Sequence, residues 1–248
     1  MAQQTGILGI QGTVGGLVFA KDGSIRQKPA SNKASFNGAA SMARTRENAS
    51  EFGGAASAGK LVRNALRQAI QSASDSKMVS RLTQKMREII GLDEDNDRGG
   101  RQVLKENTSP LLGFNFNAGA GVSQALFFGY SVELAGREVT LRVAGINPQS
   151  DIAAPQGATH YEVVYSAAAV NFETKSFSAA TVAAPMGLQP LSGGALGAQN
   201  VAATLPADPA AADVVLGVLG INFYQELNGK FYPLNNNSSN PLAIVFVG

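Results

Sequence analysis

The hydrophobic periodicity of this 248-residue chain changes near Pro110. Over part of the chain before that point apolar residues recur at spacings of three and four, as in amphipathic helices, whereas the later runs are short and strand-like. We therefore expect an α+β protein that ends in an antiparallel, immunoglobulin-like β-sandwich over residues 111–248. The other predicted domains are a glycine-rich arm with a β-hairpin over residues 1–42 and a basic helical hairpin over residues 43–110.

Glycine stands at every third position near the N-terminus, at Gly6, Gly9, Gly12 and Gly15. The pattern lacks the proline of a collagen helix, and no Gly-Lys-Ser/Thr follows it as in a phosphate-binding loop. It predicts an extended arm. The alternative is an arm that packs on a neighbouring subunit at places where only glycine fits.

A β-hairpin is expected directly after this arm. Asp22-Gly23 lies between two short strand-like runs, which is a strong signal for a tight hairpin turn. Pro29 ends the second strand because it has no backbone N–H to donate. An isolated two-stranded hairpin is only marginally stable in water, so this one requires a sheet or a partner on which to lie.

Two helices are expected between residues 43 and 90. The first, over about 43–73, contains three glycines, each of which costs about 1 kcal/mol relative to Ala. Either the helix breaks at these glycines or another backbone packs closely on them. The second helix runs from about 76 to 90 and stops at Gly91, and the short connection predicts an antiparallel helical hairpin.

Charge is divided unevenly along the chain. Residues 1–110 carry 16 Lys/Arg and 10 Asp/Glu, a net charge of +6, and residues 111–248 carry 4 and 8, a net charge of −4. Basic residues follow helical spacing at Lys60, Arg63 and Arg67 and at Lys77, Arg81 and Lys85. Such stripes are typical of a solvated face, or of contact with nucleic acid or an acidic partner. Few aromatic residues accompany them, which weighs against single-stranded nucleic acid.

The sequence pattern in the second half of the chain predicts a series of short strands. They are expected at 112–117, 125–134, 138–144, 160–165, 171–177, 214–226, 230–234 and 242–247. Asn228-Gly229 is a second hairpin turn. The segment 178–213 is rich in Ala, Gly and Pro and is expected to be a loop or weak strand, either disordered alone or ordered by packing on something else.

The residue types present exclude several kinds of active site. With no Cys and one His, the chain cannot supply a thiol nucleophile, a cysteine-ligated metal or a multi-histidine centre. His160 lies within a strand-like run, and no Gly-x-Ser-x-Gly elbow occurs. The acidic run 93–97 lacks the Gly and Glu that an EF-hand loop needs. We expect no enzyme, no cofactor and no metal site.

No apolar run approaches the ~20 residues that a membrane-spanning helix requires. The N-terminal residues show neither a cationic leader nor a continuous apolar core, so no secretory signal is predicted. We therefore expect no membrane span, and a cytoplasmic assembly or a virion component.

Arg26, Lys28 and Pro29 form an Arg-x-Lys-Pro element at the end of the predicted hairpin. This element and the glycine-rich start resemble those of uncharacterised Bacteroidota proteins. The segments that carry the resemblance are 13–29, 44–67, 154–164, 216–234 and 240–247. The resemblance implies a bacterial or prophage-encoded protein with a structural role, and it brings no catalytic or ligand-binding residue.

These features together favour a structural subunit that self-assembles into a filament, tube or virion-like array. The arm of one copy reaches its neighbour, and the basic half of one copy meets the acidic half of the next. The predicted subunit-interface residues are Gly9, Gly12, Gly15, Val18 and Phe19 in the arm, and Arg63, Arg67, Arg81 and Lys85 on the basic face. The alternatives are a nucleic-acid-associated protein that uses the helical hairpin, and a secreted adhesin or carbohydrate-binding sandwich.

Overall fold

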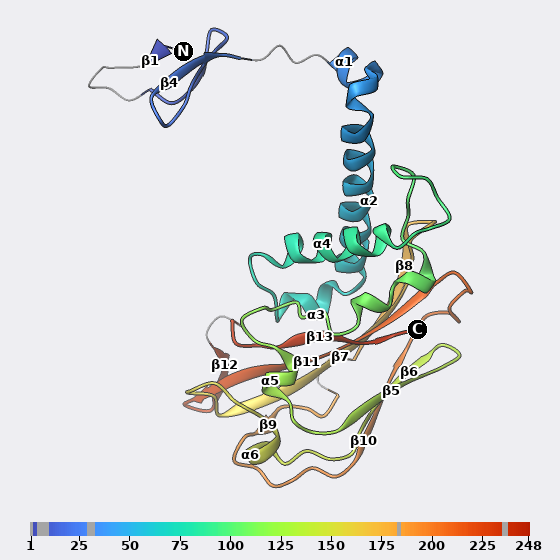
Figure 1. Ribbon diagram of the computed structural model, residues 1–248. Coiled ribbons are helices and arrows are strands. Elements are labelled where there is room, and N and C mark those ends of the chain that lie inside the picture. Colours follow the sequence, from blue (N-terminus) through green and yellow to red (C-terminus); the bar gives the residue numbers. More distant parts are fainter. Residues whose placement is uncertain (1, 4–9, 29–32, 183–184, 235–237) are drawn as a thin grey trace. The chain divides into compact units, whose positions relative to one another are not determined.

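The computed structural model describes residues 2–3, 10–28, 33–182, 185–234 and 238–248 (Figure 1). The chain divides into two compact units, Met1–Arg46 and Glu47–Gly248. They are called the first and second unit below. The division lies close to the predicted boundary after residue 42. Residues 47–110 make up most of the predicted helical domain 43–110, and they belong to the same unit as the β-rich remainder.

The first unit contains a small antiparallel sheet. Its described strands are β1 (Ala2–Gln3), β2 (Gly12–Val14), β3 (Leu17–Phe19) and β4 (Ser24–Gln27), in the order β1-β4-β3-β2. The hairpin predicted at Asp22-Gly23 is confirmed, since β3 pairs with β4 and the Asp22 carboxylate accepts a hydrogen bond from Ser24 N at 3.0 Å. Two short helical segments follow, α1 (Lys33–Gly38) and η1 (Ala40–Met42).

Two glycines of the predicted arm belong to this sheet, since Gly12 lies in β2 and Gly15 in the turn that follows it. Gly15 and Gly16 have φ values of 55° and 83° and connect β2 to β3. This is the left-handed conformation that a type I′ hairpin turn requires at both central positions. Gly6 and Gly9 lie outside the described residues.

The helices of the second unit are α2 (Ala43–Ala65, which begins in the first unit), α3 (Arg67–Gln71) and α4 (Met78–Gly91). The predicted helix 43–73 is interrupted at Leu66, which separates α2 from α3. The helix α2 continues through its three glycines, and no other described backbone segment packs closely against them. A Cβ on Gly53 would meet no atom within 4 Å, and one on Gly59 would meet the Leu82 side chain at 3.6 Å.

The remaining elements are mostly strands. The short helices are η2 (Lys105–Asn107), η3 (Ser109–Leu111), α5 (Val122–Ala125) and α6 (Pro148–Asp151). The strands are β5 (Tyr130–Ala135), β6 (Glu138–Val143), β7 (His160–Asn171), β8 (Ser176–Val182), β9 (Gln189–Pro190), β10 (Gln199–Thr204), β11 (Val214–Leu227), β12 (Lys230–Pro233) and β13 (Leu242–Val247).

These strands form two antiparallel sheets. The larger has the order β12-β11-β7-β8, with β13 also paired to β11 and β9 also paired to β7. The smaller has the order β10-β6-β5. The hairpin predicted at Asn228-Gly229 is confirmed between β11 and β12, with φ values of 52° and 75° at its two central residues. The second unit is therefore of the α+β class.

The larger sheet is the middle of three layers. Val164, Ala168 and Val170 of β7 pack against buried residues of α2 and α4. The alternate residues Tyr165 and Ala167 pack against the smaller sheet. Both faces of β7 and β11 are thus buried, which explains the nearly continuous apolar run of β11. The sequence predicts a sandwich of two layers. The structure differs because helices cover one face of the larger sheet.

Two predicted strands take another form. The run 171–177 is expected to be one strand, but it spans the turn between the end of β7 and the start of β8. The run 112–117 was expected to be a strand, but it follows η3 as an extended segment along the edge of β13. Gly113 N donates to Ile244 O at 2.8 Å, and Phe116 N donates to Leu242 O at 2.8 Å. The segment therefore covers an edge that a neighbouring chain would otherwise be able to pair with.

Candidate subunit interface

The first unit has no buried core among the side chains that the structure describes. Every described side chain of residues 10–46 is either exposed or half-buried. Large apolar side chains remain open to solvent, with exposed fractions of 50% for Ile10, 63% for Val14 and 43% for Leu17. Since its strands are two to four residues long, this sheet needs another surface to be stable.

The structure brings most of the predicted arm residues together in this sheet. Gly12 pairs with Phe19, and Val18 pairs with Arg26 across the β3–β4 ladder. Val18 and Phe19 are half-buried. A Cβ on Gly12 or Gly15 would meet no atom within 4 Å, so within the described chain their positive φ, and not a close contact, favours glycine. Gly9 lies outside the described residues.

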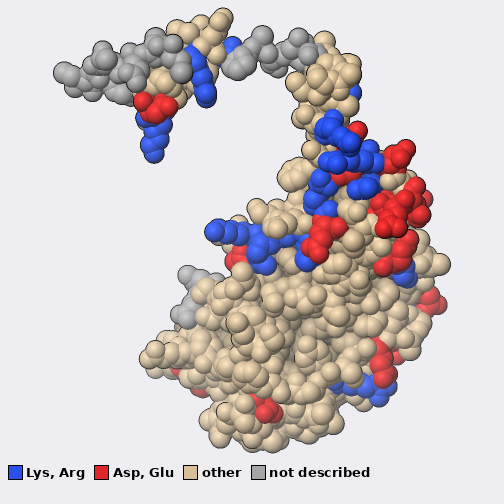
Figure 2. Space-filling model, viewed as in Figure 1, with Lys and Arg blue, Asp and Glu red and all other residues tan. Residues whose placement is uncertain are grey.

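Most of the basic excess belongs to the first unit. Residues 1–46 carry six Lys/Arg and one Asp, a net charge of +5, and residues 47–248 carry 14 Lys/Arg and 17 Asp/Glu, a net charge of −3. Residues 47–110 alone carry 10 Lys/Arg and 9 Asp/Glu. Figure 2 shows acidic side chains gathered beside α2, where the loop 93–97 lies. The helical segment is therefore close to neutral within the second unit.

The four predicted residues of the basic face lie in different environments. Arg67 is exposed and Arg63 half-exposed, and neither has a partner among the described residues. Lys85 forms an exposed ion pair with Glu88 at 2.7 Å, of the kind that contributes little to stability. Arg81 is committed internally, since its guanidinium pairs with Asp75 and donates to Asn115 O at 2.7 Å.

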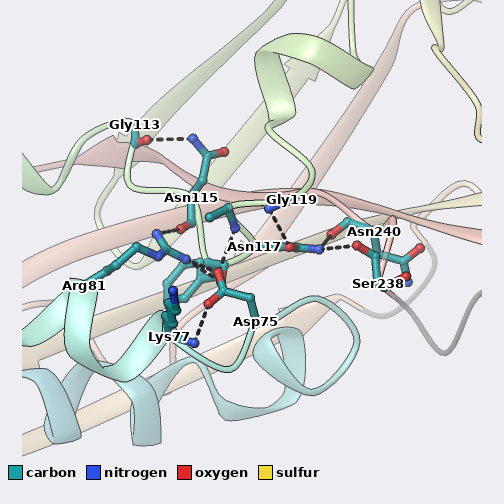
Figure 3. A network of polar contacts seen from close by, with 11 residues as sticks. Asp75, Lys77, Arg81, Gly113, Asn115, Asn117, Gly119, Ser238 and Asn240 are labelled. Carbon is teal, nitrogen blue, oxygen red and sulfur yellow. Dashed lines mark hydrogen bonds and ion pairs between the residues drawn. The ribbon is translucent and has the colours of Figure 1, made fainter.

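Asp75 and Arg81 belong to a polar network that joins the helices to the segment 113–118 (Figure 3). The Asp75 carboxylate accepts hydrogen bonds from Ala118 N at 2.8 Å, from Arg81 and from Lys77 N at 2.6 Å. Burial alone raises the pKa of Asp75, but these hydrogen bonds outweigh it and hold the pKa below its usual value. The ion pair between Asp75 and Arg81 therefore stabilises the fold.

Two buried asparagines extend the network into the large sheet. Asn117 Nδ2 donates to Asn240 O at 3.0 Å and to Ser238 O at 2.9 Å. Asn240 Nδ2 in turn donates to Ser72 O at 2.9 Å, and Asn240 Oδ1 accepts from Phe223 N at 3.1 Å. These bonds connect the end of α3 to β11. The sequence pattern did not predict this network.

His160 and Glu162, both on β7, form further side-chain contacts. His160 contacts the Phe231 ring edge-on, and its Nε2 lies 3.8 Å from a Glu226 carboxylate oxygen. The Glu162 carboxylate accepts a hydrogen bond from Tyr224 Oη at 2.8 Å, and burial together with this contact raises the pKa of Tyr224 to about 12. Among the described residues, no group of three His, Asp or Glu is placed to hold a metal ion.

Comparison of the chain with protein-family models, with curated proteins and with solved structures gave no match. The resemblance to Bacteroidota proteins therefore stays a prediction. Within the part of the chain that the structure describes, no helix is both long and apolar enough to cross a membrane.

Proposed function

We propose that the protein is a non-enzymatic structural subunit that assembles with copies of itself through its first unit. The observation that carries the proposal is a sheet with exposed apolar side chains and no described buried residue. Covering Val14 and Leu17 removes apolar surface from water, and each Å² contributes about 25 cal/mol. A second copy supplies the covering surface, and the products are a filament, a tube or a virion-like array.

Charge supports a second copy as the partner. The first unit carries +5 and the second unit −3, so contact between unlike units of two copies is attractive. Such a contact joins different surfaces on the two molecules, and it therefore propagates into a chain or closes into a ring.

The acceptor that we propose is the edge strand β5. It pairs only with β6 among the described residues, and its exposed apolar side chains are Tyr130 and Leu134, with exposed fractions of 39% and 37%. A strand of the first unit that adds to this edge gains main-chain hydrogen bonds and covers those side chains. The N-terminal arm exchange that the sequence predicts then takes place as the addition of a strand to β5.

The test is the size of the full-length protein in solution, measured by light scattering after size-exclusion chromatography and by negative-stain electron microscopy. We expect wild-type protein to form large particles, and the double variant Val14→Asp/Leu17→Asp to be a folded monomer. Leu227→Asp is the matched control, since Leu227 is 51% exposed but lies in the second unit. A wild-type monomer at every concentration and salt, or assembly that the double variant leaves unchanged, contradicts the proposal.

Nucleic acid is the second candidate partner, because the +5 charge of the first unit also attracts phosphates. This alternative predicts that a labelled oligonucleotide binds at low salt, with an affinity that falls steeply as salt is added. Fluorescence anisotropy measures it directly. No binding at low salt excludes it and leaves self-assembly untouched.

A further inference from the structure

The second unit contains a pocket of about 350 Å³ at one end of its helical layer. Gly54 and Leu61 of α2 form one side, and Ile90 of α4 lies beside them. Arg101 comes from the loop after α4, and Phe172 and Lys175 come from the β7–β8 turn. The volume lies at the lower end of the range for small-molecule sites in proteins.

Arg101 is the unusual member of this lining. It is half-buried, and its Nε is shielded from solvent without a hydrogen-bond partner. Neither Arg101 nor Lys175 forms an ion pair or hydrogen bond with another described residue. Buried donors in proteins are nearly always paired, and a guanidinium group has five N–H bonds to satisfy. Arg101 lines the pocket, and none of the described residues supplies an acceptor to its Nε.

The backbone on both sides of Arg101 is held in place. The Asp93 carboxylate is fully buried and accepts hydrogen bonds from Asn96 N at 3.1 Å and Gln102 N at 2.8 Å. The Glu51 carboxylate accepts from Gly99 N at 2.9 Å. The guanidinium therefore extends from a short segment fixed at both ends, which is the preorganisation that a binding site requires.

The rest of the pocket lining is mixed, with Ser57, Gln102 and Glu173 beside apolar residues. Leu61, Val103 and Phe172 are partly buried and pack against the core, and Ile90 is buried. The lining therefore carries two positive charges, on Arg101 and Lys175, and one negative charge, on Glu173. A ligand with one negative charge and an apolar part matches the two cations and the apolar side of this lining.

We propose that this pocket binds a small monocarboxylate, whose carboxylate pairs with the Arg101 guanidinium and whose hydrocarbon part lies against Leu61, Val103 and Phe172. Arginine presents parallel N–H groups that match the two oxygens of a carboxylate. Lys175 adds a second positive charge at the rim. The site lies wholly in the second unit, so it is independent of the proposed assembly.

Isothermal titration calorimetry on the full-length protein tests the site, with octanoate as the probe and octan-1-ol as its uncharged match. We expect octanoate to bind one to one and at least tenfold more tightly than octan-1-ol. Arg101→Met is expected to weaken octanoate binding at least tenfold. Arg67→Met is the matched control, because Arg67 is exposed, has no described partner and does not line the pocket.

Gly54→Leu provides a second variant that does not depend on charge. A Cβ at this position meets only Ile90 Cδ1, at 3.6 Å, so the larger side chain is accommodated by the helix while it occupies the pocket. We expect a folded protein, verified by circular dichroism, with octanoate affinity reduced at least tenfold. The proposal is overturned if wild-type protein does not bind octanoate, if Arg101→Met binds as wild type does, or if Arg67→Met weakens binding equally.

Discussion

Replacement of Asn240 by alanine tests whether the buried asparagine network fastens the helices to the large sheet. Asn240 is 0% exposed. Its side chain donates to Ser72 O at 2.9 Å and to Asn222 Oδ1 at 3.2 Å, and it accepts from Phe223 N at 3.1 Å. Ser72 directly follows α3, and Phe223 belongs to β11. Asn240 is thus a direct polar connection between two layers of the second unit.

The size of the effect follows from these three hydrogen bonds. The two bonds that Asn240 donates contribute about 1 kcal/mol each, and the Phe223 N–H left without an acceptor costs about 1–3 kcal/mol. We expect Asn240→Ala to lower the free energy of unfolding by about 3–5 kcal/mol, which is a large part of the ~5–15 kcal/mol typical of a domain. Few single substitutions reach this size.

Urea unfolding followed by far-ultraviolet circular dichroism is the suitable assay, because the chain has no Trp for fluorescence. The matched control is Asn200→Ala, since Asn200 is exposed on β10 and is expected to change the free energy by less than about 0.5 kcal/mol. A loss below about 1 kcal/mol for Asn240→Ala, with an unchanged denaturant slope, would refute the structural role assigned to the network.

The other predictions concern glycines and a buried carboxylate. Gly53→Ala is expected to stabilise the protein by about 1 kcal/mol, because a Cβ there meets nothing within 4 Å and alanine favours helix; urea unfolding measures this. Gly220→Ala is expected to cost about 1–3 kcal/mol in the same assay, since its Cβ would lie 2.6 Å from Pro241 O. Burial alone raises the pKa of Asp93, but hydrogen bonds from Gln102 and Asn96 outweigh it and lower the pKa. Its stabilisation is therefore complete above about pH 3.8 and is lost as the pH falls through the lowered value, so Asp93→Asn should flatten acid unfolding followed by circular dichroism.

Local conformational requirements explain the parts of the fold that the sequence predicted well. Asp22-Gly23 and Asn228-Gly229 are turn sequences that favour a left-handed backbone, and both connect paired strands in the structure. The stripe of α4 repeats without interruption until Gly91, and the predicted bounds differ from the observed ones by one or two residues. In these segments the information lies within a few neighbouring residues.

The layer arrangement depends on contacts between distant segments, and the sequence pattern did not reveal it. The predicted strands 160–165 and 171–177 leave out residues 166–170, which include three of the alanines that are depleted in strands. In the structure Ala167, Ala168 and Ala169 lie in the middle of β7, with helices on one face and the smaller sheet on the other. Small side chains suit a strand that is covered on both faces. Strand propensity depends on residue type alone, so it does not indicate that a second layer covers the strand.

Helical spacing also failed to distinguish charged residues with internal partners from those without. Their contacts in the structure favour a different surface as the interface. Helical spacing treats Arg67 and Arg81 as equivalent. The two terminal NH groups of Arg81 bind Asp75 and two carbonyl groups, although its Nε has no partner, whereas Arg67 has no described partner at all. Residues 47–110 hold nearly equal numbers of basic and acidic side chains, so the +6 of the first 110 residues comes mainly from residues 1–46. The basic member of the proposed contact is then the first unit itself, whose exposed apolar side chains also need to be covered. Charge and apolar exposure thus favour the same surface, and the Val14→Asp/Leu17→Asp variant tests both contributions, since it removes the apolar contact and lowers the positive charge.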